Sequence, residues 1–253
     1  MKKFFLFVAA VAAAMTVNAA DKTWNFTALF NSENVPTFTV GDGATPDVLI
    51  KNEVMVYGNA KDKAWALDFG QSAKYFVDFL TAEDQDAEGK LARLKSGGAG
   101  AVEAGKIKGA IAFKVAGSST IKIAAVSSSG SDTRKMQVLD GNGTEIASFK
   151  FDGNIGKKVD GEIVTEPFVV NYTGAATTIY IISAAQVTDV ATDGYKAGGI
   201  NFYKIAATNV ADWNSGQGIE DLNDGVKAVK VFENGQLVII KNGVRYNALG
   251  AAL

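Results

Sequence analysis

Ala110 to Val126 has the sequence AIAFKVAGSSTIKIAAV, two short apolar runs joined by a connector of Ala, Gly and Ser. The first run, AIAFKV, is compact and apolar, which is typical of a buried strand. In the second run, alternation places Ile121 and Ile123 on one face and Lys122 on the other, because successive side chains of a strand point to opposite faces. The stretch therefore predicts two β-strands with a short connection between them.

Short apolar or alternating runs of this kind recur through most of the chain. Glycine makes up 27 of the 253 residues, and clusters of Gly, Ser and Asn separate the runs, as expected of turns. Asp140-Gly-Asn-Gly143 has the composition of a hairpin loop between two of the runs. Further strands are expected at Val48 to Tyr57, Lys135 to Leu139, Glu145 to Phe151, Phe168 to Tyr172, Thr178 to Ser183 and Gly199 to Ile205.

The regular spacing of these strands predicts an all-β protein. Only one stretch, near Gln85 to Leu94, has a helical pattern, so a fold of alternating strands and helices is not favoured. We expect an antiparallel β-sandwich with jelly-roll topology. The competing architecture is a right-handed parallel β-helix, which needs a repeat of roughly twenty or more residues, and no such repeat is visible in the chain.

The N-terminal segment 1–19 predicts a secretory signal peptide. Lys2 and Lys3 form a charged start, an apolar stretch follows up to Met15, and small residues precede the expected cleavage after Ala19. The apolar stretch is about twelve residues long, shorter than the roughly twenty residues that span a bilayer as a helix, and no later apolar segment is longer. No cysteine follows it to accept a lipid. We therefore expect an exported protein without a transmembrane segment.

The C-terminal segment 226–253 predicts a small separate β-meander. Asn234-Gly235 and Asn242-Gly243 separate alternating runs, and Asn-Gly supplies the two positive-φ residues of a type I′ hairpin turn. The preceding segment 211–225 is polar and Gly-rich like a linker, which leaves 20–210 as the main domain. The alternative is that the three strands complete the main sandwich. They are expected near 227–233, 236–241 and 244–248.

Composition excludes several classes of function. The chain has no histidine, so Ser-His-Asp and Cys-His catalysis and the usual zinc and copper ligand sets are ruled out. It has no cysteine, so no disulfide framework exists. The net charge of −2 becomes −4 once Lys2 and Lys3 leave with the signal. Nucleic acid is not an expected partner at this charge, because phosphate contacts need clustered Lys and Arg.

Three polar stretches have some features of a metal-binding, phosphate-binding or acidic site. Asp140 to Gly143 is the nearest local match to a Ca²⁺ loop, although it lacks the full acidic alternation of such loops, and we expect an ordinary turn. Ser96 to Gly100 (SGGAG) has no following Lys-Ser or Lys-Thr, so we expect a flexible loop instead of a phosphate-binding loop. The acidic residues Glu83, Asp84, Asp86 and Glu88 are expected in a solvated loop.

A family resemblance rests on short motifs between Lys22 and Ala207. The motifs are Thr23 to Phe26 (TWNF), Ala66 to Gly70 (ALDFG), Gly109 to Val115 (GAIAFKV), Ile121 to Ile123 (IKI), Arg134 to Leu139 (RKMQVL), Thr178 to Ser183 (TIYIIS) and Gly199 to Ile205 (GINFYKI). With these motifs the chain resembles the secreted β-sandwich modules found beside pectate lyases and other glycan-active proteins in Gram-negative gut-type bacteria, which are similar to carbohydrate-binding jelly rolls. It departs from the multidomain members because it carries no catalytic domain.

The C-terminal meander carries a second resemblance. Glu233 to Ile240 (ENGQLVII) and Lys241 to Asn247 (KNGVRYN), followed by Leu249-Gly250, resemble the C-terminal sorting domains of cargo for the type IX secretion system. The resemblance implies an interaction with the secretion machinery through this region. It also implies a location outside the cell or on the outer surface of a Gram-negative bacterium.

Together these observations predict a secreted, non-catalytic module that binds a glycan or another cell-surface component. A polysaccharide ligand needs an exposed aromatic face and polar side chains for the sugar hydroxyls. One alternative is a structural or adhesive surface protein that binds protein partners. A weaker alternative is a lyase or glycosidase built on carboxylates, Lys and Tyr. The aromatic candidates, near expected loops or strand ends, are Trp65, Tyr57, Tyr75 and Tyr195.

Overall fold

A computed structural model of the protein describes residues 19–29, 48–59, 65–71, 76, 78–103, 106–151, 158–159, 162–163, 166–212, 229–233, 236–241 and 244–247. The chain divides into two compact units, Met1–Trp213 and Asn214–Leu253. The predicted signal segment up to residue 18, and the part of the predicted linker that follows Asp212, lie outside the described residues.

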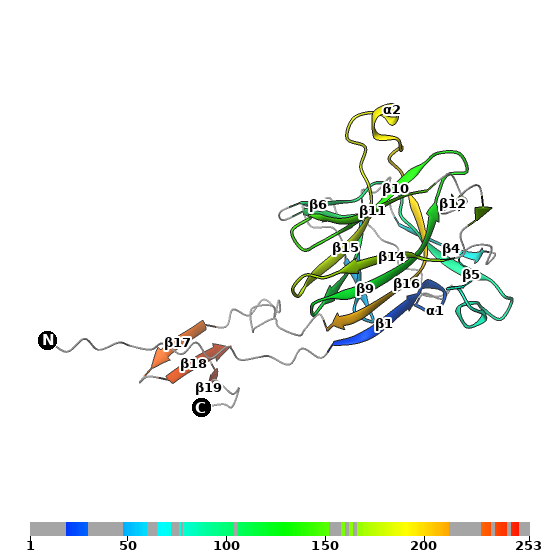
Figure 1. Cartoon of the computed structure of the whole chain (residues 1–253). Helices are drawn as coiled ribbons and strands as arrows, with labels where there is room; N and C mark the ends of the chain where they lie inside the picture. Colours follow the sequence, from blue (N-terminus) through cyan, green and yellow to red (C-terminus); the bar gives the residue numbers. More distant parts are fainter. Residues whose placement is uncertain are drawn as a thin grey trace. The chain divides into compact units, whose positions relative to one another are not determined.

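The first layer of the larger unit is organised around β16 (Ile200–Ala211), a strand of 12 residues. One edge of β16 pairs with β9, which pairs with β14. The other edge pairs with β1 and, near the start of β16, with β5, which pairs with β4. All these pairs are antiparallel, and Figure 1 shows β14, β9, β16 and β1 side by side. The bounds are β1 (Ala19–Asn25), β4 (Ala66–Gln71), β5 (Leu91–Lys95), β9 (Ser119–Ser127) and β14 (Phe168–Tyr172).

The second layer has the strand order β11-β10-β15-β8-β3-β2, again with antiparallel pairing throughout. The two layers are joined where Val210 and Ala211 of β16 pair with Val115 and Lys114 of β8. Hydrogen bonding therefore continues from one layer into the other. The bounds are β2 (Val48–Lys51), β3 (Val54–Tyr57), β8 (Ala110–Val115), β10 (Arg134–Leu139), β11 (Glu145–Phe151) and β15 (Thr177–Ser183).

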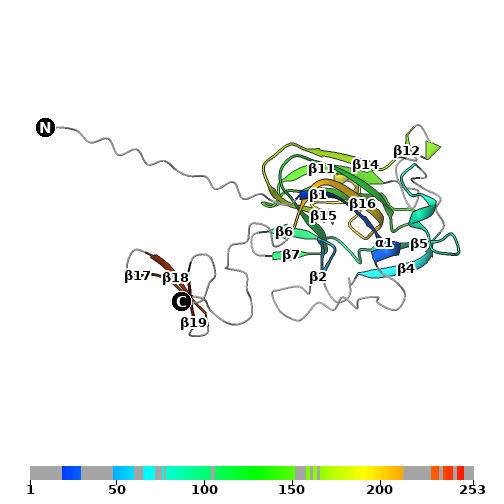
Figure 2. The ribbon, with the colours of Figure 1, turned by 90° about the horizontal axis from the view of Figure 1, so that it is seen from below.

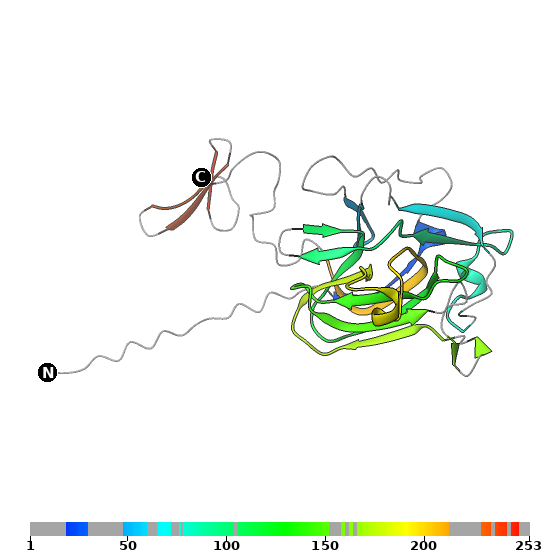
Figure 3. The same ribbon diagram turned by 90° about the horizontal axis from the view of Figure 1, so that it is seen from above.

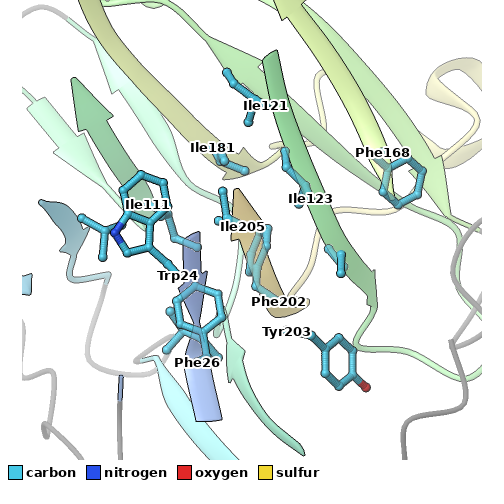
Figure 4. Packing of buried hydrophobic residues seen from close by; sticks show 14 of the residues in the cluster. Trp24, Phe26, Ile111, Ile121, Ile123, Phe168, Ile181, Phe202, Tyr203 and Ile205 are labelled. Carbon is cyan, nitrogen blue, oxygen red and sulfur yellow. The ribbon is translucent and has the colours of Figure 1, made fainter. Parts of the chain in front are cut away.

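The core lies between the two layers. Ile121 and Ile123 of the first layer are fully buried and Lys122 is exposed, as the alternation of the sequence predicts. In Figure 4 these isoleucines lie in the same cluster as Ile111 and Ile181 of the second layer. Burial of such side chains is the main favourable contribution to folding.

Aromatic rings close the core at its margins. Trp24 of β1 lies 4.8 Å from Phe113, measured between ring centroids. At the open side of the sandwich, Phe168 of β14 lies 4.9 Å from Phe149 and 5.1 Å from Phe151 of β11. Because β14 and β11 are the edge strands of their layers, these rings seal the gap between the two edges.

The remaining elements of the described residues are short. A hairpin, β6–β7, stands beside the second layer (Figure 2), and β12 and β13 form another small hairpin. The bounds are α1 (Phe26–Leu29), the 3₁₀ helix η2 (Ala82–Asp84), β6 (Ala101–Glu103), β7 (Lys106–Lys108), β12 (Lys158–Val159), β13 (Glu162–Ile163) and α2 (Val190–Asp193).

The smaller unit contains an antiparallel sheet of three strands in the order β17-β18-β19. The pairs Glu233 with Gln236 and Lys241 with Val244 end its two ladders, so each connection has two residues, the predicted Asn-Gly pairs. The bounds are β17 (Val229–Glu233), β18 (Gln236–Lys241) and β19 (Val244–Asn247).

The structure confirms the predicted fold class, an antiparallel β-sandwich with a small three-stranded meander at the C-terminal end. Strand neighbours are often far apart in the sequence, as in a jelly roll. β1 pairs with β16, and β8 pairs with β3 and β15.

Two local predictions are wrong. Gln85 to Leu94 does not form a helix, because Leu91 and Leu94 enter the core from β5 and the Asp86 carboxylate accepts the N–H groups of Glu88 and Lys90 in a turn. The run Val48 to Tyr57 is a hairpin instead of one strand. Its turn residues, Asn52 and Glu53, both have positive φ, 50° and 63°, as a type I′ turn requires.

Candidate functional site

The outer face of the second layer, the side turned away from the core, combines tyrosines with charged and amide side chains. Strand alternation assigns its residues. In β15, Ile179 and Ile181 belong to the main core, whereas Tyr180 and Ile182 belong to a second apolar cluster on the opposite side of the strand. Met55 and Tyr57 of β3 pack against the same cluster.

The β6–β7 hairpin covers the middle of this outer face. Val102 and Ile107 of the hairpin pack against the second cluster. At the base of the hairpin the backbone passes very close to the layer, because a Cβ added at Gly100 would lie 2.5 Å from the Gly109 carbonyl oxygen and 2.9 Å from Ile182 Cβ. The segment Ser96 to Gly100, expected as a flexible loop, is therefore a close-packed crossing. The hairpin leaves two flanks of the outer face, one on β3 and one on β10 and β11.

The first flank is the tyrosine pair. The ring centroids of Tyr57 and Tyr180 are 6.1 Å apart, and Tyr57 Oη donates to Met55 Sδ at 3.5 Å. Burial, together with the neighbouring Tyr180, raises the pKa of Tyr57 to about 12. The Tyr57 hydroxyl therefore stays neutral and keeps its donor hydrogen at physiological pH. Its ring is half-buried, so part of it faces solvent.

The second flank is a row of polar side chains on β10 and β11. The polar strip consists of Lys135, Gln137, Glu145, Ser148 and Lys150. Register places Lys135 opposite Lys150 and Gln137 opposite Ser148, so these four side chains share one face. Glu145 Oε2 accepts from Gln137 Nε2 at 2.6 Å and from Lys135 Nζ at 3.3 Å. Hydrogen bonds from Gln137, Ser148 and Lys135 lower the pKa of Glu145, so its carboxylate is ionised and already oriented.

Tyr195 closes one end of the polar strip. Lys135 Nζ and Lys150 Nζ each lie 5.8 Å from the centroid of its ring, a distance suited to cation–π contact. The Tyr195 side chain is only 6% exposed, and its hydroxyl donates to the carbonyl oxygen of Ala185 at 2.7 Å. Burial, with the charges of Asp193 and Glu145, raises the pKa of Tyr195. The ring therefore anchors the lysines instead of offering an open platform.

The four aromatic candidates are not brought together. Tyr57 and Tyr195 lie on opposite flanks of the outer face, and Tyr75 lies outside the described residues. Trp65 is 5% exposed and belongs to the main core, where its Nε1 donates to the Tyr57 carbonyl oxygen at 2.9 Å. The expectation that Trp65 and Tyr195 present exposed rings is therefore corrected. Within the described part of the chain, the exposed large hydrophobic side chains are valines, and no aromatic side chain is among them.

The predicted turn at Asp140 uses its carboxylate internally. Asp140 Oδ1 accepts the N–H groups of Asn142 and Thr144, both at 2.9 Å, and Gly143 has φ +79°. Among the residues that the structure describes, no group of three or more Asp and Glu side chains is placed to hold a metal ion. The described helices also include none with the length and apolar character of a membrane span.

The polar strip is not among the sites predicted from the sequence, although the sequence contains a signal for it. RKMQVL and EIASFKF flank one hairpin loop, and their polar residues alternate with apolar ones. A hairpin joins neighbouring antiparallel strands, so these polar residues had to lie on one face. The acidic residue Asp84 was also misplaced. Instead of lying in a solvated loop, it is buried and paired with Lys204.

Comparisons with known proteins give a weak structural likeness to solved structures. No family model and no curated protein matches the chain. Among solved structures, the chain is similar to the C-terminal CBM6 module of LamC, a marine laminarinase of Zobellia galactanivorans, with 13% sequence identity. The match covers 74% of this chain and 98% of that module, with a TM-score of 0.27. A likeness at this level carries no argument about what the chain binds.

Proposed function

We propose that this protein is an exported, non-catalytic module that binds a glycan through the polar strip. The observation that carries the proposal is the network around Glu145, in which an ionised carboxylate accepts from Gln137 and Lys135 on a solvent-facing sheet surface. Sugar hydroxyls both donate and accept hydrogen bonds, so they match a surface that offers a carboxylate together with amide and ammonium donors. The strip holds these groups in place before a ligand arrives.

Binding at the strip relies on hydrogen bonds more than on stacking. The Tyr195 ring is covered by its two lysines, so a sugar ring does not reach its face unless a lysine moves. The aliphatic stems of Lys135 and Lys150 provide apolar surface beside the donors. This arrangement predicts weak, hydroxyl-dependent recognition, in contrast to the tight stacking of an aromatic platform.

The directions of the pKa values support a non-catalytic role. A general acid or base works best with a pKa near the operating pH. In the polar strip the pKa of Glu145 is lowered by its hydrogen bonds, and the pKa of the adjacent Tyr195 is raised. Both pKa values are thus shifted away from neutral pH. The Tyr195 hydroxyl is also committed to the Ala185 carbonyl.

We further propose that the signal segment 1–19 exports the chain and that the meander 226–253 directs it to the outer surface. The N-terminal Lys-Lys start with its apolar run supports export. The two Asn-Gly hairpins of the meander, and the separate sheet that their strands form, support a sorting role. A glycan-binding module on the outer surface has access to polysaccharides that do not enter the cell.

The test is binding of the purified mature protein, residues 20–253, to a panel of plant and host polysaccharides, with isothermal titration of the best ligand. Glu145→Gln and Gln137→Ala are each expected to weaken binding about tenfold, the effect of losing a hydrogen bond to a charged group. The matched control is Asn171→Ala, an exposed residue on the opposite face of the sandwich. Absence of binding to the whole panel would refute the glycan function. Binding that both strip variants leave unchanged would refute the site.

A further inference from the structure

A loop that projects from one end of the sandwich carries the most exposed apolar side chains of the described residues. The valine loop, residues 185–195, includes α2 and stands out from the strands in Figure 1, and in Figure 3, seen from above, it lies in front of them. Val187 is 84% exposed and Val190 is 51% exposed. Exposed apolar groups that stand together mark interaction sites more often than single scattered ones.

The valine loop is held in one conformation by its own polar groups. Asp193 Oδ2 accepts the N–H groups of Val187 and Thr188 at 3.1 and 3.0 Å. Asp189 caps α2 by accepting the Thr192 N–H at 2.8 Å. Gly194, which has φ +67°, donates its N–H to the Val190 carbonyl oxygen at 2.9 Å. The two valines are therefore presented on a preorganised turn.

The base of the loop is tied to the second layer. Tyr195 Oη donates to the Ala185 carbonyl at 2.7 Å and so joins the two ends of the loop. Lys150 Nζ of β11 donates to the Asp193 carbonyl at 2.9 Å. Preorganisation of this kind reduces the entropy lost on binding.

The third exposed large hydrophobic side chain lies on the outer side of the first layer. Val169 of β14 is 46% exposed and stands directly opposite Lys122 of β9. Both side chains point away from the core, because Ile121 and Ile123 on either side of Lys122 point into it. Ala206 of β16 is the next partner of Lys122 across the sheet and is partly exposed. This patch, Val169, Lys122 and Ala206, combines two apolar side chains with one positive charge, and the polar pair Thr120 and Asn171 borders it on the same face.

The valine loop is complementary to this patch in charge and is apolar as well. It places Asp189 beside Val187 and Val190, and the sequence from Ala185 to Gly194 contains no basic residue. An anionic membrane surface would repel it, since juxtamembrane binding depends on Lys and Arg. We infer that the valine loop of one copy docks on the Val169–Lys122 patch of a second copy, with the valines on the apolar groups and Asp189 beside Lys122.

The contact joins two different surfaces, so it is heterologous. A heterologous contact closes into a ring if the rotation allows and otherwise continues as a chain of copies. The apolar area involved is small, so association in dilute solution is weak and is strengthened where many copies share one surface. This inference does not rest on the proposed glycan function, because Val187, Val190 and Asp189 on one surface and Val169 and Lys122 on the other are not residues of the polar strip.

Sedimentation velocity of the mature protein over a wide concentration range tests the inference. Reversible association is expected, and Val187→Asp is expected to weaken it about tenfold or more. Lys122→Glu should weaken it as well, and so should Asp189→Asn, which removes the negative charge but keeps a side-chain oxygen that can cap α2. Lys108→Glu, an exposed lysine on the β6–β7 hairpin, is the control and should have no effect.

All the substituted side chains are exposed, so each variant is expected to fold, which circular dichroism verifies. A protein that stays monomeric at every concentration would overturn the inference. So would an association that Val187→Asp or Lys122→Glu leaves intact.

Discussion

Lys204 and Asp84 form a buried ion pair that ties the η2 segment to the first layer. Lys204 Nζ donates to Asp84 Oδ2 at 2.7 Å and to the Phe79 carbonyl at 2.9 Å. Asp84 also accepts from Thr81 N at 2.8 Å and from Asn25 Nδ2 at 3.0 Å. Every polar group of the pair thus has partners, which is the condition under which buried charges are tolerated.

Replacing Lys204 by Met is expected to lower the free energy of unfolding by about 3–5 kcal/mol, because Asp84 would remain as an uncompensated buried charge. Adding Asp84→Asn should recover part of the loss, since the remaining group is then neutral. Urea denaturation measures both effects. Lys122→Met, at an exposed lysine of the same layer, is the control and should change stability by less than about 0.5 kcal/mol. Equal costs at Lys204 and Lys122 would contradict the structural role of the pair.

Whether a single side chain points into the core or to solvent was predictable from the sequence only where alternation with its neighbours in the same strand determined it. The inward positions of Ile121 and Ile123 and the outward position of Lys122 follow from alternation alone. The burial of Asp84 does not, because its partner Lys204 lies 120 residues away. Trp65 was equally unpredictable, since it precedes β4 and its burial depends on Phe202, 6.2 Å away in β16.

At the scale of elements, the β6–β7 hairpin decides which parts of the outer face reach solvent. Its position depends on the crossing of Gly100 and Gly109 above Ile182. Gly100 N–H also donates to the Ser183 carbonyl at 2.8 Å, which fixes the crossing to β15. The hairpin therefore separates the tyrosine pair from the polar strip by a defined contact.

Gly100→Ala is expected to destabilise the protein by about 1–3 kcal/mol, the usual cost of overpacking, because the new methyl group would meet backbone that has no room to move. Gly130→Ala is the matched control. Gly130 has no heavy atom within 4 Å of an added Cβ, so its replacement should change stability by less than about 0.5 kcal/mol. Hydrogen exchange at Val102 and Ile107 should accelerate in the first variant and stay unchanged in the second. Unchanged exchange in both would show that the crossing does not hold the hairpin.

Most elements were predictable because their signals are local. The hairpin of β10 and β11 follows from the Asp-Gly-Asn-Gly loop between two alternating runs, and both strands lie where they were expected. The turn of β2 and β3 was missed because Asn52 is followed by Glu53 and not by glycine, so the pair gave no type I′ signal although both residues have positive φ. β5 was missed because its leucines also fit a helical spacing.

At the scale of the whole molecule, the strands of the sandwich do not include those of the C-terminal meander. β1 and β16 pair along most of their lengths, and β16 also joins the two layers through β8. The strands of the larger unit therefore pair with one another. The strands β17, β18 and β19 pair only with one another among the described residues. Two Asn-Gly signals were enough to predict this sheet, whereas the pairing of β1 with β16 could not be predicted, because it spans nearly the whole domain.

Deleting Val226 to Leu253 therefore has two separate expected outcomes. The free energy of unfolding of the sandwich should change by less than about 0.5 kcal/mol, since no strand pair of the larger unit is lost. In a Gram-negative bacterium that has a type IX secretion system, fractionation should show the shortened protein retained inside the outer membrane, because the proposed sorting signal is gone.

Replacing Gly235 and Gly243 by Val tests the turns alone, since a β-branched residue disfavours positive φ, and it should also impair sorting. Continued arrival of the shortened protein at the outer surface would refute the sorting role. A marked loss of sandwich stability would show instead that the meander belongs to the main fold.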